Sequence, residues 1–147
     1  MNERVPVTDF TFHHHQPIQI RFNDIDLLGH LNNALYFQFM DLAKVSYFKQ
    51  FTGDRYDWSK IGLVVAHIDV DFIAPTYIND NIEVLTAVAS ISNKSLVLSQ
   101  RVVEVTTGEV KCVANTVMVN FDPASNRSVP ISDEWRKRLS DYEGRTF

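Results

Sequence analysis

The chain has 147 residues, 45% hydrophobic and 22% charged, which suits one globular domain with a sizeable core. Its formal net charge of −4, with no basic stretch, argues against a nucleic-acid partner. No apolar run approaches the ~20 residues that cross a membrane, no secretory signal is visible, and the single cysteine, Cys112, fits a reducing compartment. We therefore expect one cytoplasmic domain over residues 1–147, with no membrane partner and with Cys112 in the core.

The first half of the chain predicts one strand and one long helix. Apolar and polar residues alternate over residues 13–23, which is typical of a strand with one buried face. A turn follows, and a helix then begins at Asn32 or Asn33 and runs to about Phe51, with Gly53 as its stop signal. Apolar residues cover most of the circumference of this helix, so we expect a buried helix with neighbours on several sides.

The second half predicts strands after a loop that contains Trp58. Four strands are expected at residues 64–74, 82–91, 96–106 and 109–121, and short turns join the last three as consecutive hairpins. Ser132 is placed to cap a short C-terminal helix. This order of elements predicts an α+β domain, and its unpaired sheet edges favour a homodimer with a continuous sheet.

Residues 21–36 concentrate polar side chains at the start of an otherwise apolar helix. Asp24, Asp26 and Gly29 match positions of a calcium-binding EF-hand loop, but leucines stand where two further oxygen ligands are needed. The three consecutive histidines at 13–15 alternate between the faces of a strand, so they cannot all bind one metal. We expect no metal and no cofactor. Structural roles stay open for these residues, as an Asx turn and as the N-cap of the helix.

Asp26 and the helix start are suited to hydrolysis of an activated carbonyl such as a thioester. That reaction needs a carboxylate that attacks the carbonyl or draws a proton from water, and donors for the developing oxyanion. A helix N-terminus supplies free N–H groups and a partial positive charge. Asp26 precedes the helix start by six or seven residues, and Gly29 lets the chain fold back between them. The carboxylate and the N–H groups can therefore face one carbonyl from opposite sides.

The sequence DIDLLGHLNNALYFQFMDLAK resembles the signature D-x-D-x-x-G-H-V-N-N-x-x-Y-x-x-Y-x-E-x-A-R of the hotdog-fold thioesterases, which include 4-hydroxybenzoyl-CoA thioesterase and the plant acyl-ACP thioesterases. The residues that match in register are Asp24, Asp26, Gly29, His30, Asn32, Asn33, Tyr36 and Ala43. Asp41, Lys44 and Phe39 depart from the signature. Weaker similarity in IDVDFIAPTYINDNIEV and SNKSL extends the resemblance over nearly the whole chain.

The resemblance implies a hotdog fold, in which a five-stranded antiparallel sheet wraps around one long central helix. It implies a homodimer or a dimer of dimers, with active sites at the subunit interface. It gives Asp26 the role of nucleophile or general base and places the oxyanion at the N–H groups near Asn33. His30 or Asn32 would orient the site.

The resemblance also implies a substrate class. Lys94 and Ser95 match a hairpin that meets the CoA phosphates in the hydroxybenzoyl enzyme, so the expected substrate is an acyl-CoA, or an acyl-ACP. Two other functions on this fold stay open. A hotdog enoyl-CoA hydratase usually carries D-x-N-P-x-H, which this chain lacks. A non-catalytic acyl-CoA-binding or sensing module would not need the carboxylate of Asp26.

Overall fold

The structure, a computed structural model, describes residues 2–53 and 62–147. In chain order its elements are β1 (His14–Ile18), a 3₁₀ helix (Phe22–Asp24), α1 (Asn33–Thr52), β2 (Leu63–Phe72), β3 (Ile82–Ile91), β4 (Ser95–Glu104), β5 (Val110–Asp122), β6 (Arg127–Ser128) and α2 (Asp133–Glu143). Strands β1 to β5 and both α-helices correspond to predicted elements, whereas the two-residue strand β6 is an addition. The predicted loop with Trp58 lies outside the described residues. Within residues 2–53 and 62–147, neither helix has the length and apolar character that crossing a bilayer requires.

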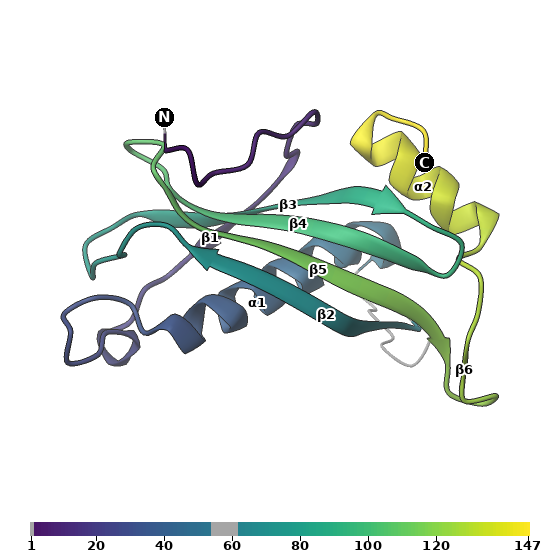
Figure 1. Cartoon of the computed structure of the whole chain (residues 1–147), viewed down its shortest axis with the longest axis horizontal. Helices are drawn as coiled ribbons and strands as arrows, with labels where there is room; N and C mark the ends of the chain where they lie inside the picture. The colour runs from purple at the N-terminus through teal and green to yellow at the C-terminus, as the bar shows by residue number, and fades with distance from the viewer. Residues whose placement is uncertain (1, 54–61) are drawn as a thin grey trace.

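The strands form an antiparallel sheet in the order β1-β3-β4-β5-β2, and β6 pairs with the end of β5. Consecutive hairpins join β3, β4 and β5, as predicted, while β1 and β2 form the two edges. Figure 1 shows α1 lying along the sheet, and α2 near the end of the sheet farthest from the start of α1. The α+β arrangement predicted from the sequence, an antiparallel sheet around one long helix, is therefore confirmed.

The core lies between the sheet and one side of α1. The buried residues of α1 are Tyr36, Phe39, Met40, Ala43, Lys44, Tyr47 and Phe48. They recur every three or four positions, which places them on one side of the helix. Cys112 of β5 is fully buried among them, and burial raises the pKa of its thiol to about 12. The prediction that Cys112 is a core residue is confirmed.

The opposite side of α1 is open. Asn33, Gln38 and Asp41 are exposed there, as are 38% of Phe37 and 51% of Leu42. The expectation of neighbours on several sides is therefore wrong for the single chain, because one five-stranded sheet covers only one side of the helix. The apolar residues on the open side form a surface that a second chain can cover.

Both edge strands are shorter than predicted. Strand β1 ends at Ile18, because the backbone beyond it leaves the ladder with β3 and enters the turn that Asp24 closes. Strand β2 ends at Phe72, since the next two N–H groups, of Ile73 and Ala74, both donate to the carbonyl oxygen of Lys111 and not to a continuing ladder.

Aromatic side chains hold the last turns of α1. Ser132 caps α2 through a 3.3 Å bond from the N–H of Trp135, as predicted. Helix α2 then packs on the end of α1, where Tyr47 and Phe51 meet Tyr142 and Trp135 edge to face. The Tyr47 hydroxyl donates to the buried carboxyl of Glu143, which also accepts the N–H of Val88 at 2.9 Å. This polar contact joins α1, α2 and β3 inside an apolar cluster.

Candidate active site

Asp24 fixes the loop that leads into α1. Its buried carboxyl accepts the N–H of Arg21 at 2.8 Å and pairs with the Arg21 guanidinium at 2.9 Å. Burial acts to raise the pKa of Asp24, but the hydrogen bonds and charge of Arg21 outweigh it, so the pKa lies below its usual range. The Asp24 carbonyl also accepts the N–H of Asn32 at 2.9 Å. Asp24 therefore has a structural role, with its carboxyl already occupied.

Asp26 lies at the base of a tight turn that returns the chain toward the helix. The N–H of Asp26 donates to the carbonyl of His30 at 3.2 Å, and its own carbonyl accepts from Gly29 at 3.0 Å. Gly29 has φ +83°, a conformation that residues with a side chain rarely adopt. One carboxyl oxygen of the half-buried Asp26 accepts the N–H of Leu28 at 2.9 Å, which is an Asx turn. The predicted turn and the predicted return of the chain at Gly29 are both present.

The start of α1 is held by both flanking segments. Asn32 is the N-cap, and its side chain accepts the N–H of Ala34 at 3.0 Å. The N–H of Leu31 donates to the carbonyl of Thr76 at 2.7 Å, from the loop between β2 and β3. Asn33 is the first helical residue, so its N–H has no acceptor within the helix and is available to a ligand.

A hollow of about 250 Å³ opens beside this helix start. Its lining residues are His30, Asn33, Tyr36, Phe72, Ile73, Ala74 and Pro75. The Tyr36 hydroxyl is buried and bonded to the Thr76 hydroxyl at 2.8 Å, which joins the helix to the opposite wall. The structure thus brings His30 and Asn33 together at one hollow. Asp26 is tied to it through the backbone of His30 but is not one of the residues that line it.

Lys94 and Ser95 lie elsewhere in the chain. They belong to the hairpin between β3 and β4, whose turn is bonded to α2 through Arg136 and Ser92. The ten-residue strand β3 spans roughly 30 Å and separates this hairpin from the start of α1 (Figure 1). Within one chain, the residues predicted to meet CoA phosphates are therefore not part of the hollow beside Asn33.

The wall of the hollow that residues 73–75 form was not predicted from the sequence. The segment IDVDFIAPTYINDNIEV carries part of the resemblance, but no local pattern indicates that Thr76 bonds to Leu31 and Tyr36. In residues 2–53 and 62–147, no group of three His, Cys, Asp or Glu side chains is placed to hold a metal ion.

Comparison with known proteins decides the family. The model of the thioesterase-like superfamily matches residues 20–139. The chain belongs to this superfamily. Among solved structures, a thioesterase from Thermus thermophilus complexed with coenzyme A and Zn aligns with a TM-score of 0.80 and 28% identity, over 90% of this chain and 96% of that one. The predicted family, the hotdog fold and the thioesterase class of enzyme are confirmed.

Two curated relatives carry thioesterase names. The long-chain acyl-CoA thioesterase FadM of Escherichia coli K12 is 25% identical over 125 residues, which is 83% of this chain and 93% of that protein. The acyl-CoA thioester hydrolase YbgC of Escherichia coli O6:H1 is 27% identical over 89 residues, which is 59% of this chain and 66% of that protein. Both names describe hydrolysis of acyl-CoA thioesters.

Proposed function

We propose that this thioesterase hydrolyses acyl-CoA thioesters at the hollow beside the start of α1, with Asp26 as the acting carboxylate. The observation that carries the proposal is the turn closed by the bond from the Asp26 N–H to the His30 carbonyl. This turn ties the segment that carries Asp26 to His30, two residues before the N-cap Asn32, and the N–H of Asn33 has no acceptor within the helix. The acyl-CoA names of FadM and YbgC, and the coenzyme A bound to the Thermus thioesterase, support the substrate class.

The N–H of Asn33 would donate to the thioester carbonyl, and the partial positive charge of the helix end would favour the oxyanion. Removing one such donor typically lowers kcat by about 10²–10³-fold. Asn32 would hold that N–H in place as the N-cap, since its side chain is occupied by the N–H of Ala34. His30, which lines the hollow, would orient the reacting group.

Two courses of reaction suit Asp26. As a general base, it takes a proton from water while the oxygen of that water adds to the carbonyl, and the tetrahedral intermediate then expels the CoA thiolate. As a nucleophile, it forms an acyl-aspartyl anhydride with loss of the thiolate, and water then hydrolyses the anhydride. Both courses yield a carboxylic acid and free CoA thiol, and neither needs a metal or cofactor.

We infer that the active unit is a homodimer. Among the described residues, strand β2 pairs with β5 alone and its other edge has no strand partner, and 45% of Val64 and 50% of Val65 are exposed. Antiparallel pairing of two β2 edges would extend the sheet, and the two-fold axis would reverse the partner chain. The partner's β3–β4 end would then lie on the side where this chain's Asp26 lies. Lys94 and Ser95 of that end would approach the CoA phosphates, and two such dimers would give the tetramer.

A thiol-release assay over short, long and aromatic acyl-CoAs tests the proposal, with Asp26→Asn beside the unchanged protein. Asparagine keeps an oxygen that accepts the N–H of Leu28, so the turn is retained while the carboxylate is lost. We expect kcat to fall by at least about 10²-fold, the effect of losing a general base. Asp141→Asn on α2, an exposed residue paired with Lys137, is the control and should keep full turnover.

Undiminished turnover in Asp26→Asn would overturn the role of Asp26. Binding of acyl-CoA without turnover in the unchanged protein would favour the sensing module. Release from acyl-ACP in preference to acyl-CoA would change the carrier but not the chemistry. A monomeric mass by ultracentrifugation would overturn the dimer.

A further inference from the structure

Lys111 occupies an irregular position in β5. Val102 of β4 pairs with Cys112, and the next residue, Val103, pairs with Val110, so Lys111 is the extra residue of a β-bulge. Bulges commonly redirect one side chain. Lys111 is only 4% exposed, which is unusual for a lysine unless its ammonium group is paired.

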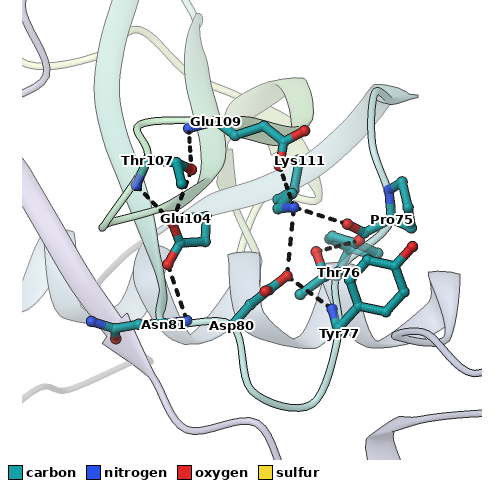
Figure 2. Close-up of polar contacts among 10 residues, drawn as sticks. Pro75, Thr76, Tyr77, Asp80, Asn81, Glu104, Thr107, Glu109 and Lys111 are labelled. Atoms are coloured by element: carbon teal, nitrogen blue, oxygen red, sulfur yellow. Dashed lines mark hydrogen bonds and ion pairs between the residues drawn. The ribbon is translucent and has the colours of Figure 1, made fainter.

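The backbone and the side chain of Lys111 both bind the wall of the hollow. Its carbonyl accepts the N–H groups of Ile73 at 2.9 Å and Ala74 at 3.1 Å. Its ammonium donates to the carbonyl of Pro75 at 3.0 Å, as Figure 2 shows. Ile73, Ala74 and Pro75 are consecutive residues of the lining. A single residue, Lys111, therefore bonds to three residues of this wall.

Two carboxylates keep the ammonium charged and in place. Glu109 bonds to it directly, and Asp80 lies at 3.5 Å (Figure 2). Burial acts to lower the pKa of Lys111, but these two carboxylates outweigh it and hold the pKa above its usual value. Asp80 also accepts the N–H of Tyr77 at 2.9 Å, which closes the turn of the same loop. The loop between β2 and β3 is therefore tied to β5 near its start, at residues 73–75, and again near its end, at Asp80.

The same loop is tied to the helix on its other side. Thr76, one residue beyond Pro75, accepts the N–H of Leu31 and bonds to the Tyr36 hydroxyl. The distance between the wall and the helix start thus depends on a loop held between Lys111 and α1. Loss of the ammonium would free the carbonyl of Pro75, the wall residue next to Thr76, while the backbone bonds of Ile73 and Ala74 would remain.

We propose that Lys111 is a positioning residue that sets the width of the hollow and thereby the preference among acyl groups. This inference rests on the proposed function, since it assumes that the acyl thioester reacts at that hollow. Lys111 would act through Ile73–Pro75 and would not touch the substrate. The other possibility is a purely structural role, in which loss of Lys111 lowers stability and all activities alike.

Glu104 provides a matched control. It is also a buried charged residue, 7% exposed, at the adjacent hairpin end. Its carboxylate accepts the N–H and the hydroxyl of Thr107 at 2.7 and 2.9 Å, and the N–H of Asn81 at 3.4 Å (Figure 2). These bonds hold a turn and the far end of the loop, and none reaches the three wall residues. Glu104→Gln should therefore lower stability without changing acyl preference.

The experiment measures kcat and KM for butyryl-, palmitoyl- and benzoyl-CoA in the full chain and in Lys111→Met, Lys111→Arg and Glu104→Gln. We expect Lys111→Met to change the ratio of kcat/KM between the substrates by about tenfold, mainly through kcat, because small misplacements in a site cost up to about 10²-fold. Lys111→Arg, which keeps the charge, should stay within about threefold of the original ratio. Glu104→Gln should leave the ratio unchanged.

An equal loss on all three substrates in Lys111→Met would overturn the proposal, as would the same change of ratio in Glu104→Gln. If Lys111→Met does not fold, Asp80→Asn removes one of the two partner charges and keeps the oxygen that accepts the N–H of Tyr77, and the ratio is measured there. Absence of turnover in the unchanged protein on every substrate would instead refute the proposed function. The two failures are thus distinguishable.

Discussion

The two ends of α1 are held by different forces. At its start, backbone and capping bonds from Asp24, Asn32 and Thr76 fix the helix, and the surface there stays open. At its end, interlocking aromatic rings around Tyr47 and Phe51 exclude water. Directional polar bonds fix positions while leaving the N–H of Asn33 available, whereas apolar burial supplies most of the stability. The comparison indicates that polar bonds set the geometry of the helix start and that the aromatic end contributes stability.

The largest difference should come from the two buried tyrosines of α1. Tyr47→Phe leaves the buried carboxyl of Glu143 without one of its two donors, so we expect the free energy of unfolding to fall by about 2 kcal/mol, with turnover unchanged. Tyr36→Phe removes only a bond between two hydroxyls, with an expected loss of about 1 kcal/mol, but turnover should fall because Tyr36 lines the hollow. Urea unfolding and thiol release measure the two effects. Equal effects of the two variants on both stability and turnover would contradict the contrast between the two ends of α1.

The helix caps offer a smaller test of the same contrast. Asn32→Ala and Ser132→Ala each remove the side-chain acceptor of a helix start, and each should lower stability by about 1 kcal/mol. Only Asn32→Ala should also lower kcat, because only that cap positions the N–H groups beside the hollow. Thermal unfolding and steady-state kinetics on the two variants provide the measurement. A comparable loss of kcat in Ser132→Ala would show that lower stability of the whole domain, and not the cap beside the hollow, explains the loss of activity.

The smallest expected effect is a loss of stability in acid, which should act through the carboxyl of Glu104 at the end of β4. Hydrogen bonds from Thr107 lower the pKa of Glu104 from 4.5 to about 2. A carboxyl with a lowered pKa contributes its full stability above the ordinary value and loses it as the pH falls through the lowered one. The unchanged protein should therefore lose more stability between pH 5 and pH 2 than Glu104→Gln does. Urea midpoints across this range provide the measurement, and parallel curves would contradict the assignment.

Features that depend on local pattern could be predicted from the sequence. The strand predicted at residues 82–91 has the same bounds as β3, because the residues of the turn that follows signal it locally. The start of α1 at Asn33 and its stop at Gly53 were also predicted, since caps and stop signals are local chemistry. In the site, the signature led to Asp26, His30 and Asn33, and the structure brings His30 and Asn33 together at one hollow, which Asp26 does not line.

Features that depend on pairing between distant segments could not be predicted. The bulge at Lys111 depends on the register between β4 and β5, and no residue near it signals the extra position. The bond between Leu31 and Thr76 joins segments on either side of the long helix. The resemblance grouped Lys94 with the site, yet the length of β3 separates them in one chain. Asp24 matched the signature as well, and only its pairing with Arg21 revealed a structural role.

The strand order has a consequence for how the chain folds. Strands β3, β4 and β5 are neighbours in sequence as well as in space, so their hairpins close short loops. Strand β2 pairs with β5, which is two strands later in the sequence, and β1 pairs with β3, from which α1 and β2 separate it in the sequence. We expect the β3–β5 meander to form the folding nucleus and the edge strands to join late, in the slower range typical of non-local pairing. High φ-values in β3 to β5 and low φ-values in β2 would report this order, which leaves the β2 edge as the last part of the sheet to assemble.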